Sequence, residues 1–146
     1  MAVPEHPSVS APLDERTLAT IADGLACADP AAFLPSGDGR RWAQIASTSS
    51  YSAWVIAWPG GTGLGMHDHD GSAAAVRVVS GTLRERYVQP GGIAVRWLTS
   101  PGVTLLAADH VHEVINVGAD EAISVHVYSP PLADTSFRDD PEIVLR

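Results

Sequence analysis

The sequence predicts a single all-β domain, a jelly-roll barrel or sandwich with one short helix near its N-terminus. Two observations predict this fold. Apolar residues recur at helical spacing over residues 13–28. From Arg41 onward, short runs rich in valine, isoleucine, threonine and tryptophan alternate with glycine and proline. With 146 residues, 45 % of them hydrophobic, the chain is long enough to form one folded core.

The chain begins with a polar, proline-containing stretch, which predicts a flexible tail over residues 1–12 and a folded domain over 13–146. The helix is expected over 13–28, where acidic residues in the first turn suit a helix N-terminus. Its apolar positions are Leu13, Leu18, Ile21 and Leu25. The Asp29-Pro30 pair then ends the helix, and the barrel follows over about 41–132.

The barrel is predicted to contain eight short strands separated by glycine and proline turns. They are expected near residues 41–47, 51–58, 73–79, 82–89, 92–98, 103–107, 111–116 and 121–128. Strands this short and closely spaced are typical of a jelly roll.

Composition excludes several classes of function. The net charge is −8 and all nine basic residues are arginine, so we expect no nucleic-acid partner. No apolar run approaches the ~18 residues of a membrane span, and the polar N-terminus does not resemble a secretory signal. Cys27 is the single cysteine, which excludes an internal disulfide. We therefore expect a cytoplasmic protein.

Histidines are concentrated in the predicted barrel. Five of the six lie between residues 67 and 126, and four form two His-x-His pairs, His67 with His69 and His110 with His112. Residues two apart on an extended segment point to the same face, so each pair could grip one metal ion. The alternative is that each histidine is an ordinary hydrogen-bonded residue, but two such pairs in one predicted barrel favour a metal site.

The first pair lies in a wider pattern. Gly61, five residues, His67-x-His69 and then Gly81 match the first signature of the cupin barrels. Many cupins carry a ligating glutamate where this chain has Ala74. The predicted metal ligands are therefore neutral histidines without a carboxylate.

The second cupin signature ends in His-x3-Asn, and His112 with Asn116 fits it. His110 does not fit, because Val114 stands at the asparagine position. His112 is therefore the predicted third ligand and His110 a neighbour of open role. Three neutral ligands leave positions for an anionic thiolate, although the same set holding zinc would resemble a water-activating site.

Taken together, the motifs resemble the cysteine dioxygenase family of cupin thiol dioxygenases over roughly residues 40–132. The matching pieces are Trp58, His67-Asp68-His69, Ser72, Gly81-Thr82-Leu83-Arg84-Glu85, His112-Glu113-Val114-Ile115-Asn116 and Ser124-Val125-His126-Val127-Tyr128-Ser129-Pro130-Pro131. The resemblance implies an iron(II) enzyme that inserts both atoms of O2 into the sulfur of a small carboxylate-bearing thiol, giving a sulfinic acid. The implied iron ligands are His67, His69 and His112.

The resemblance also implies that Tyr128 lies beside the substrate and oxygen, held through a relay of His126 and Ser124. These three residues alternate along one predicted strand and so share a face. The Ser129-Pro130 bond is a candidate cis peptide, as in family members. Ala74 stands where vertebrate members carry a cysteine that cross-links to the tyrosine, so we expect no cross-link, as in bacterial members.

The substrate site is expected to contain Trp58 and an arginine, whose fork of donors matches a carboxylate. Arg41, seventeen residues before Trp58, occupies the position of the family's substrate arginine. Gly39 replaces a tyrosine common in members that act on cysteine, and Arg138 lies near the arginine of a subgroup acting on 3-mercaptopropionate. L-Cysteine is our first substrate and 3-mercaptopropionate the second.

Two other classes of function remain open at this point. A metal-binding cupin without redox chemistry would explain the histidines but not the Ser124, His126 and Tyr128 pattern. A cupin isomerase or hydrolase with zinc, nickel or manganese would need a carboxylate in the pocket, which Glu85 or Asp70 could supply as a base. The expected partner is a small-molecule thiol, and a homodimer is possible for such barrels.

Overall fold

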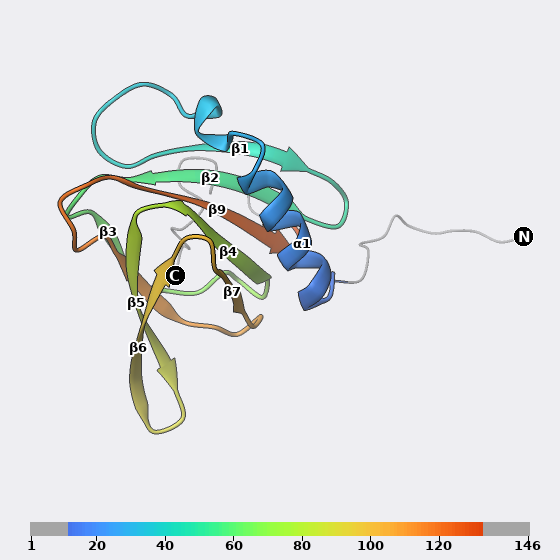
Figure 1. Ribbon diagram of the computed structural model, residues 1–146. Coiled ribbons are helices and arrows are strands. Elements are labelled where there is room, and N and C mark those ends of the chain that lie inside the picture. Colours follow the sequence, from blue (N-terminus) through green and yellow to red (C-terminus); the bar gives the residue numbers. More distant parts are fainter. Residues whose placement is uncertain (1–11, 133–146) are drawn as a thin grey trace, which may run out of the picture.

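The computed structural model describes residues 12–132, which fold into two antiparallel sheets and one α-helix (Figure 1). Apart from its last residue, the predicted tail lies outside the described residues, as does the chain beyond residue 132. The elements are α1 (Glu15–Ala26), the 3-10 helix η1 (Pro30–Phe33), β1 (Arg41–Ser47), β2 (Ser52–Trp58), β3 (Gly63–His67), β4 (Ala73–Ser80), β5 (Thr82–Gln89), β6 (Gly92–Thr99), β7 (Val103–Leu106), β8 (His112–Ile115) and β9 (Ala122–Ser129).

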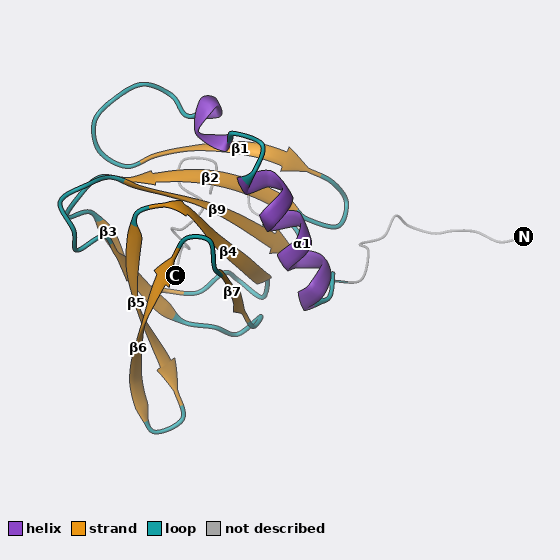
Figure 2. Cartoon of the chain, in the orientation of Figure 1, coloured by secondary structure: helices purple, strands orange, loops and turns teal. Residues whose placement is uncertain are grey.

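The strands form a five-stranded sheet in the order β1-β2-β9-β4-β7 and a four-stranded sheet in the order β3-β8-β5-β6 (Figure 2). This is a single jelly-roll domain, and the predicted all-β class is confirmed. All eight predicted strands are present. The prediction missed β3, because its sequence Gly-Leu-Gly-Met-His contains no β-branched residue.

Helix α1 begins and ends two residues inside its predicted limits. The Oδ1 atom of Asp14 accepts a hydrogen bond from the Thr17 amide at 2.8 Å and so caps the helix. Leu18 and Ala22 are buried in a cluster with residues of β4 and β9, so the helix covers the outer face of the five-stranded sheet (Figure 1). In residues 12–132, no helix is long and apolar enough to cross a membrane.

A second apolar cluster fills the space between the two sheets. It joins Ile56 and Trp58 of β2 to Leu83 of β5, Val114 of β8 and Tyr128 of β9. In the five-stranded sheet these side chains alternate with residues that face the helix side, as expected for strands buried on both faces. The inner face of the barrel therefore carries the aromatic side chains of the predicted site.

Candidate metal centre and its surroundings

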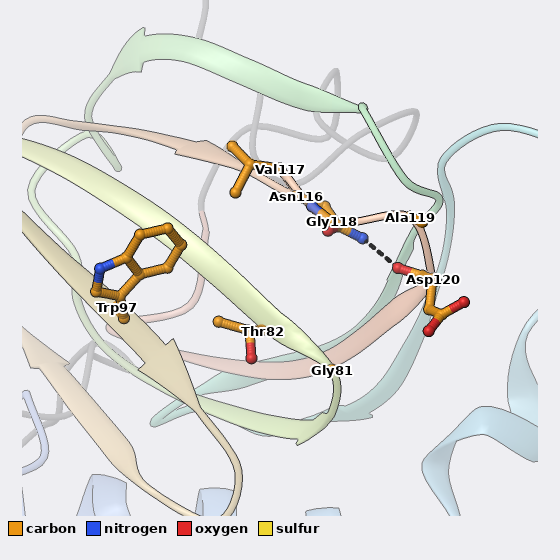
Figure 3. Close-up of a pocket in the computed structure, with 8 residues that line it drawn as sticks. All are labelled: Gly81, Thr82, Trp97, Asn116, Val117, Gly118, Ala119 and Asp120. Atoms are coloured by element: carbon orange, nitrogen blue, oxygen red, sulfur yellow. Dashed lines mark hydrogen bonds between the residues drawn. The ribbon is translucent and has the colours of Figure 1, made fainter.

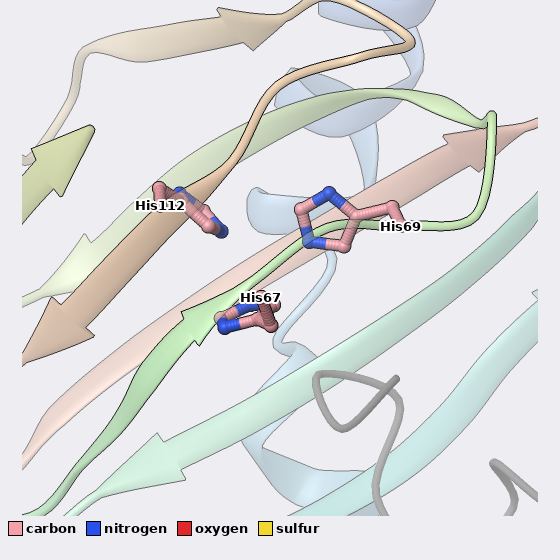
Figure 4. Close-up of side chains that lie close together, drawn as sticks. All are labelled: His67, His69 and His112. Carbon is pink, nitrogen blue, oxygen red and sulfur yellow. The ribbon is translucent and has the colours of Figure 1, made fainter. Parts of the chain in front are cut away.

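Three histidines converge inside the barrel (Figure 4). His67 ends β3 and His112 begins β8, and the antiparallel register places them directly opposite each other. His69 follows two residues after β3. One ring nitrogen from each histidine lies within 4.8 Å of the other two, and all three side chains are buried. Imidazoles at this spacing can coordinate one metal ion.

A turn, rather than strand alternation alone, brings His69 to the cluster. The strand ends at His67, Asp70 adopts a positive φ of 53°, and the Ser72 amide donates to the His69 carbonyl at 3.1 Å. The rings of His67 and His69 lie edge to face with centroids 5.3 Å apart. Asp70 is exposed and does not join the cluster.

The Nδ1 atoms of two of these rings have hydrogen-bond acceptors. His67 Nδ1 donates to the Gly65 carbonyl at 2.7 Å, and His112 Nδ1 donates to Oε2 of Glu85 at 2.7 Å. These bonds keep the ring proton on Nδ1 and leave Nε2 as the ligand atom. The donor set of neutral imidazoles therefore fits a divalent transition metal such as iron(II) or zinc.

Glu85, which the sequence analysis considered only as a possible base, lies directly behind His112. Its side chain is fully buried, and its carboxylate accepts hydrogen bonds from His112, His110 and Arg96. Burial by itself raises the pKa of Glu85, but the bonds from the two imidazoles and the guanidinium outweigh it and hold the pKa far below its usual range. The role of His110, open from the sequence, is thus a contact to this carboxylate.

The predicted relay lies on β9. Ser124 Oγ lies 2.7 Å from His126 Nε2, and the His126 ring stacks on Tyr128 with centroids 6.2 Å apart. Tyr128 is fully buried, and its ring centroid lies 5.3 Å from that of His69. The structure adds Trp58, whose Nε1 donates to Ser124 Oγ at 2.9 Å. These side chains share one face, as the alternation predicted.

The structure does not bring Arg41 to this site. Arg41 is paired with Ala57 on the face toward the helix, and its guanidinium forms a 2.5 Å ion pair with Glu121. The preceding residue, Arg40, lies on the inner face instead, with its Cζ 4.4 Å from the Trp58 ring centroid. Arg40 and Arg41 therefore face opposite sides of the sheet, because the side chains of successive residues in an extended segment alternate between its two faces.

Two further expectations concern the end of β9. Arg138, the alternative substrate arginine, lies outside the described residues. The Ser129-Pro130 peptide bond is cis, as the resemblance implied. Ala74 pairs directly with Tyr128 across β4 and β9, so the position of the cross-linking cysteine in other members lies beside the tyrosine here as well.

Asn116, the last residue of the second signature, has a structural role. Its Nδ2 donates to the carbonyls of Trp58 and Asp120, and its Oδ1 accepts from the Gly118 amide. It thereby ties the loop after β8 to the end of β2. This loop borders a hollow of about 320 Å³ with Trp97 on its other side (Figure 3), and none of the three clustered histidines lines it.

A jelly-roll barrel with three buried histidines where two antiparallel strands meet defines a cupin with a candidate metal site. Within this class, the family model described as "Cysteine dioxygenase type I" matches residues 31–139, well over half of the chain. The chain therefore belongs to the cysteine dioxygenase type I family, and the resemblance inferred from the sequence is confirmed.

Solved structures share the fold. The TT1209 protein from Thermus thermophilus is 18 % identical, with a TM-score of 0.57, and the match covers 66 % of this chain and 88 % of that one. KdgF from Halomonas sp. is 17 % identical, with a TM-score of 0.56 and coverage of 66 % and 86 %. The cupin domain of Schizosaccharomyces pombe Cnp3 is 13 % identical, with a TM-score of 0.57 and coverage of 77 % and 76 %. No curated protein sequence matches significantly.

Proposed function

We propose that this protein is an iron(II)-dependent thiol dioxygenase that converts a small carboxylate-bearing thiol into a sulfinic acid. The observation that carries the proposal is the position of Tyr128, whose ring lies 5.3 Å from that of His69. A metal-binding cupin without oxidation chemistry gives no reason for a buried tyrosine beside its candidate metal ligands. Membership of the cysteine dioxygenase type I family supports the same activity.

The residues of the site have separate roles in the proposed reaction. His67, His69 and His112 hold the metal, and iron(II) bound there supplies the redox chemistry that joins dioxygen to sulfur. Tyr128 donates a hydrogen bond toward the reacting sulfur and oxygen atoms. The Ser124 and His126 relay orients Tyr128, and the apolar inner face of the barrel excludes bulk water. The main contribution of the protein is to hold both reactants in one orientation.

The substrate carboxylate requires a cation on the inner face, and Arg40 is the described arginine that stacks on Trp58 there. Its guanidinium also lies over Trp42, with 5.5 Å between Cζ and the ring centroid. Two indoles that fix its plane would prepare its fork of donors for both carboxylate oxygens. We propose Arg40 as the carboxylate-binding residue for L-cysteine, the first substrate, with Arg138 as the alternative for 3-mercaptopropionate.

The deciding experiment is oxygen consumption by iron(II)-loaded protein offered L-cysteine, 3-mercaptopropionate and cysteamine separately, with product masses determined. We expect uptake with an acidic thiol and a product heavier by two oxygen atoms. The His69→Ala variant is the control and should consume no oxygen. If iron-loaded wild-type protein consumes none with any of the three thiols, the proposed substrate class is wrong, and a non-oxygenase cupin becomes the better interpretation.

A further inference from the structure

A buried carboxylate stands directly behind one of the three histidines. Glu85 on β5 is fully buried, and its Oε2 atom accepts hydrogen bonds of 2.7 Å from both His112 Nδ1 and His110 Nε2. Its other oxygen, Oε1, accepts from Arg96 Nε. Three strands thus contribute to one cluster, because Arg96 lies on β6 and His112 on β8.

The bonds around Glu85 hold it as an anion. A carboxylate in a buried position is costly unless charged or polar donors surround it. Here the guanidinium of Arg96 provides a charge-assisted bond to one oxygen, and two imidazoles donate to the other. An ionised carboxylate can only accept, so His112 must carry its proton on Nδ1.

Two of the three candidate ligands therefore have hydrogen-bond acceptors of different charge. His67 donates to the neutral carbonyl of Gly65, whereas His112 donates to an anion. A hydrogen bond to an anion makes the imidazole a stronger donor to a metal. The three candidate ligands are neutral, because Ala74 stands where many cupins carry a ligating glutamate. Glu85 places a negative charge next to the other ring nitrogen of one ligand, His112.

We propose that Glu85 is a positioning residue of the metal site, which fixes the tautomer and ring orientation of His112 and increases the affinity for the metal. His110 and Arg96 hold the Glu85 carboxylate in place for this role. The inference rests on the proposed metal centre. A purely structural role of Glu85, as a link between three strands, would leave the affinity for the metal unchanged. The proposed role changes that affinity.

Co(II) is a suitable probe because its visible absorption reports ligand geometry without turnover. We would titrate metal-free wild type, Glu85→Gln and Glu113→Gln with Co(II) in competition with a chelator. Glu113 is the matched control, because it neighbours His112 on β8 but pairs with Arg86 on the outer face. We expect Glu85→Gln to weaken Co(II) binding roughly 10- to 100-fold and to alter the absorption spectrum, with Glu113→Gln unchanged.

The possible failures are distinguishable. If wild type binds no Co(II), the metal centre fails and the inference fails with it. If wild type binds and Glu85→Gln, folded by circular dichroism, binds equally with the same spectrum, only the role of Glu85 is overturned. If Glu85→Gln does not fold, Arg96→Ala is the second variant, because it removes a partly exposed hydrogen-bond donor to the carboxylate. It must then weaken Co(II) binding in the same direction, and unchanged binding would overturn the proposal.

Discussion

Trp58 on β2 and Ser124 on β9 are joined by a buried hydrogen bond of 2.9 Å from the indole Nε1 to the hydroxyl Oγ. Ser124 in turn lies 2.7 Å from His126, whose ring stacks on Tyr128. The support of the tyrosine therefore begins on a neighbouring strand. Because every member of this row is buried, each of its contacts is made in a medium that strengthens hydrogen bonds.

Replacing Tyr128 with phenylalanine removes only a hydroxyl from this row. We expect turnover of the thiol to fall about 100-fold or more, the range for loss of a positioned hydrogen-bond donor to the reacting atoms, while bound iron stays at the wild-type level. Oxygen uptake and metal analysis measure the two quantities. Tyr51→Phe is the control, since Tyr51 packs against the helix-side cluster. Unchanged turnover in Tyr128→Phe would remove this residue from the mechanism.

The two adjacent arginines provide a second test. Arg40→Ala should raise the KM for L-cysteine about tenfold or more, as expected when a charged hydrogen-bond partner is lost. It should leave the KM for cysteamine, which lacks a carboxylate, unchanged. Arg41→Ala breaks a surface ion pair with Glu121 and should alter neither value. A larger effect of Arg138→Ala on acidic thiols would transfer the role to that residue.

Most of the fold could be predicted because most strands have strong local signals. Alternating valine, isoleucine and tryptophan between glycine and proline turns located eight of the nine strands in residues 12–132. The exception, β3, contains two glycines, which weaken the strand pattern. Tertiary structure explains the glycine at position 63, because a Cβ there would lie 2.5 Å from the Val114 carbonyl oxygen of β8.

The histidine cluster could be predicted from spacing, whereas its surroundings could not. His67, His69 and His112 match short motifs, and the structure brings them together. Glu85 gains its role only through strand pairing, which sequence spacing does not encode. The choice between Arg40 and Arg41 depends on one position of register, and an error of one residue turns a side chain to the opposite face.

The close approach of β3 to β8 predicts a sharp difference between two glycines. Gly63→Ala must separate the strands, because its Cβ would meet backbone and side-chain atoms of Val114 and Ile115 within 2.8 Å. We expect a loss of about 1–3 kcal/mol in the free energy of unfolding and weaker Co(II) binding, since His67 moves away from His112. Gly65→Ala, which meets open space, should preserve both. Chemical denaturation and Co(II) titration would measure them, and equal behaviour of the two variants would contradict the argument.

The low pKa of Glu85 predicts a specific dependence of stability on pH in the metal-free protein. The carboxyl has an ordinary pKa near 4.5 in the unfolded chain and a much lower one when folded. As pH falls below about 4.5, the unfolded chain therefore takes up a proton that the folded protein does not, and the equilibrium shifts toward unfolding. Stability from this group is complete above that pH and is lost progressively as the pH falls toward the folded-state pKa.

The Glu85→Gln variant isolates this contribution, because an amide does not titrate. We expect it to be less stable than wild type at neutral pH and to show a shallower fall in unfolding free energy between about pH 5 and pH 3. Urea denaturation at several pH values, with Glu113→Gln as the control on the outer face, measures the difference. Parallel curves for wild type and Glu85→Gln would mean that the carboxyl takes up its proton alike in both states, and the buried anion behind His112 would then be the wrong description.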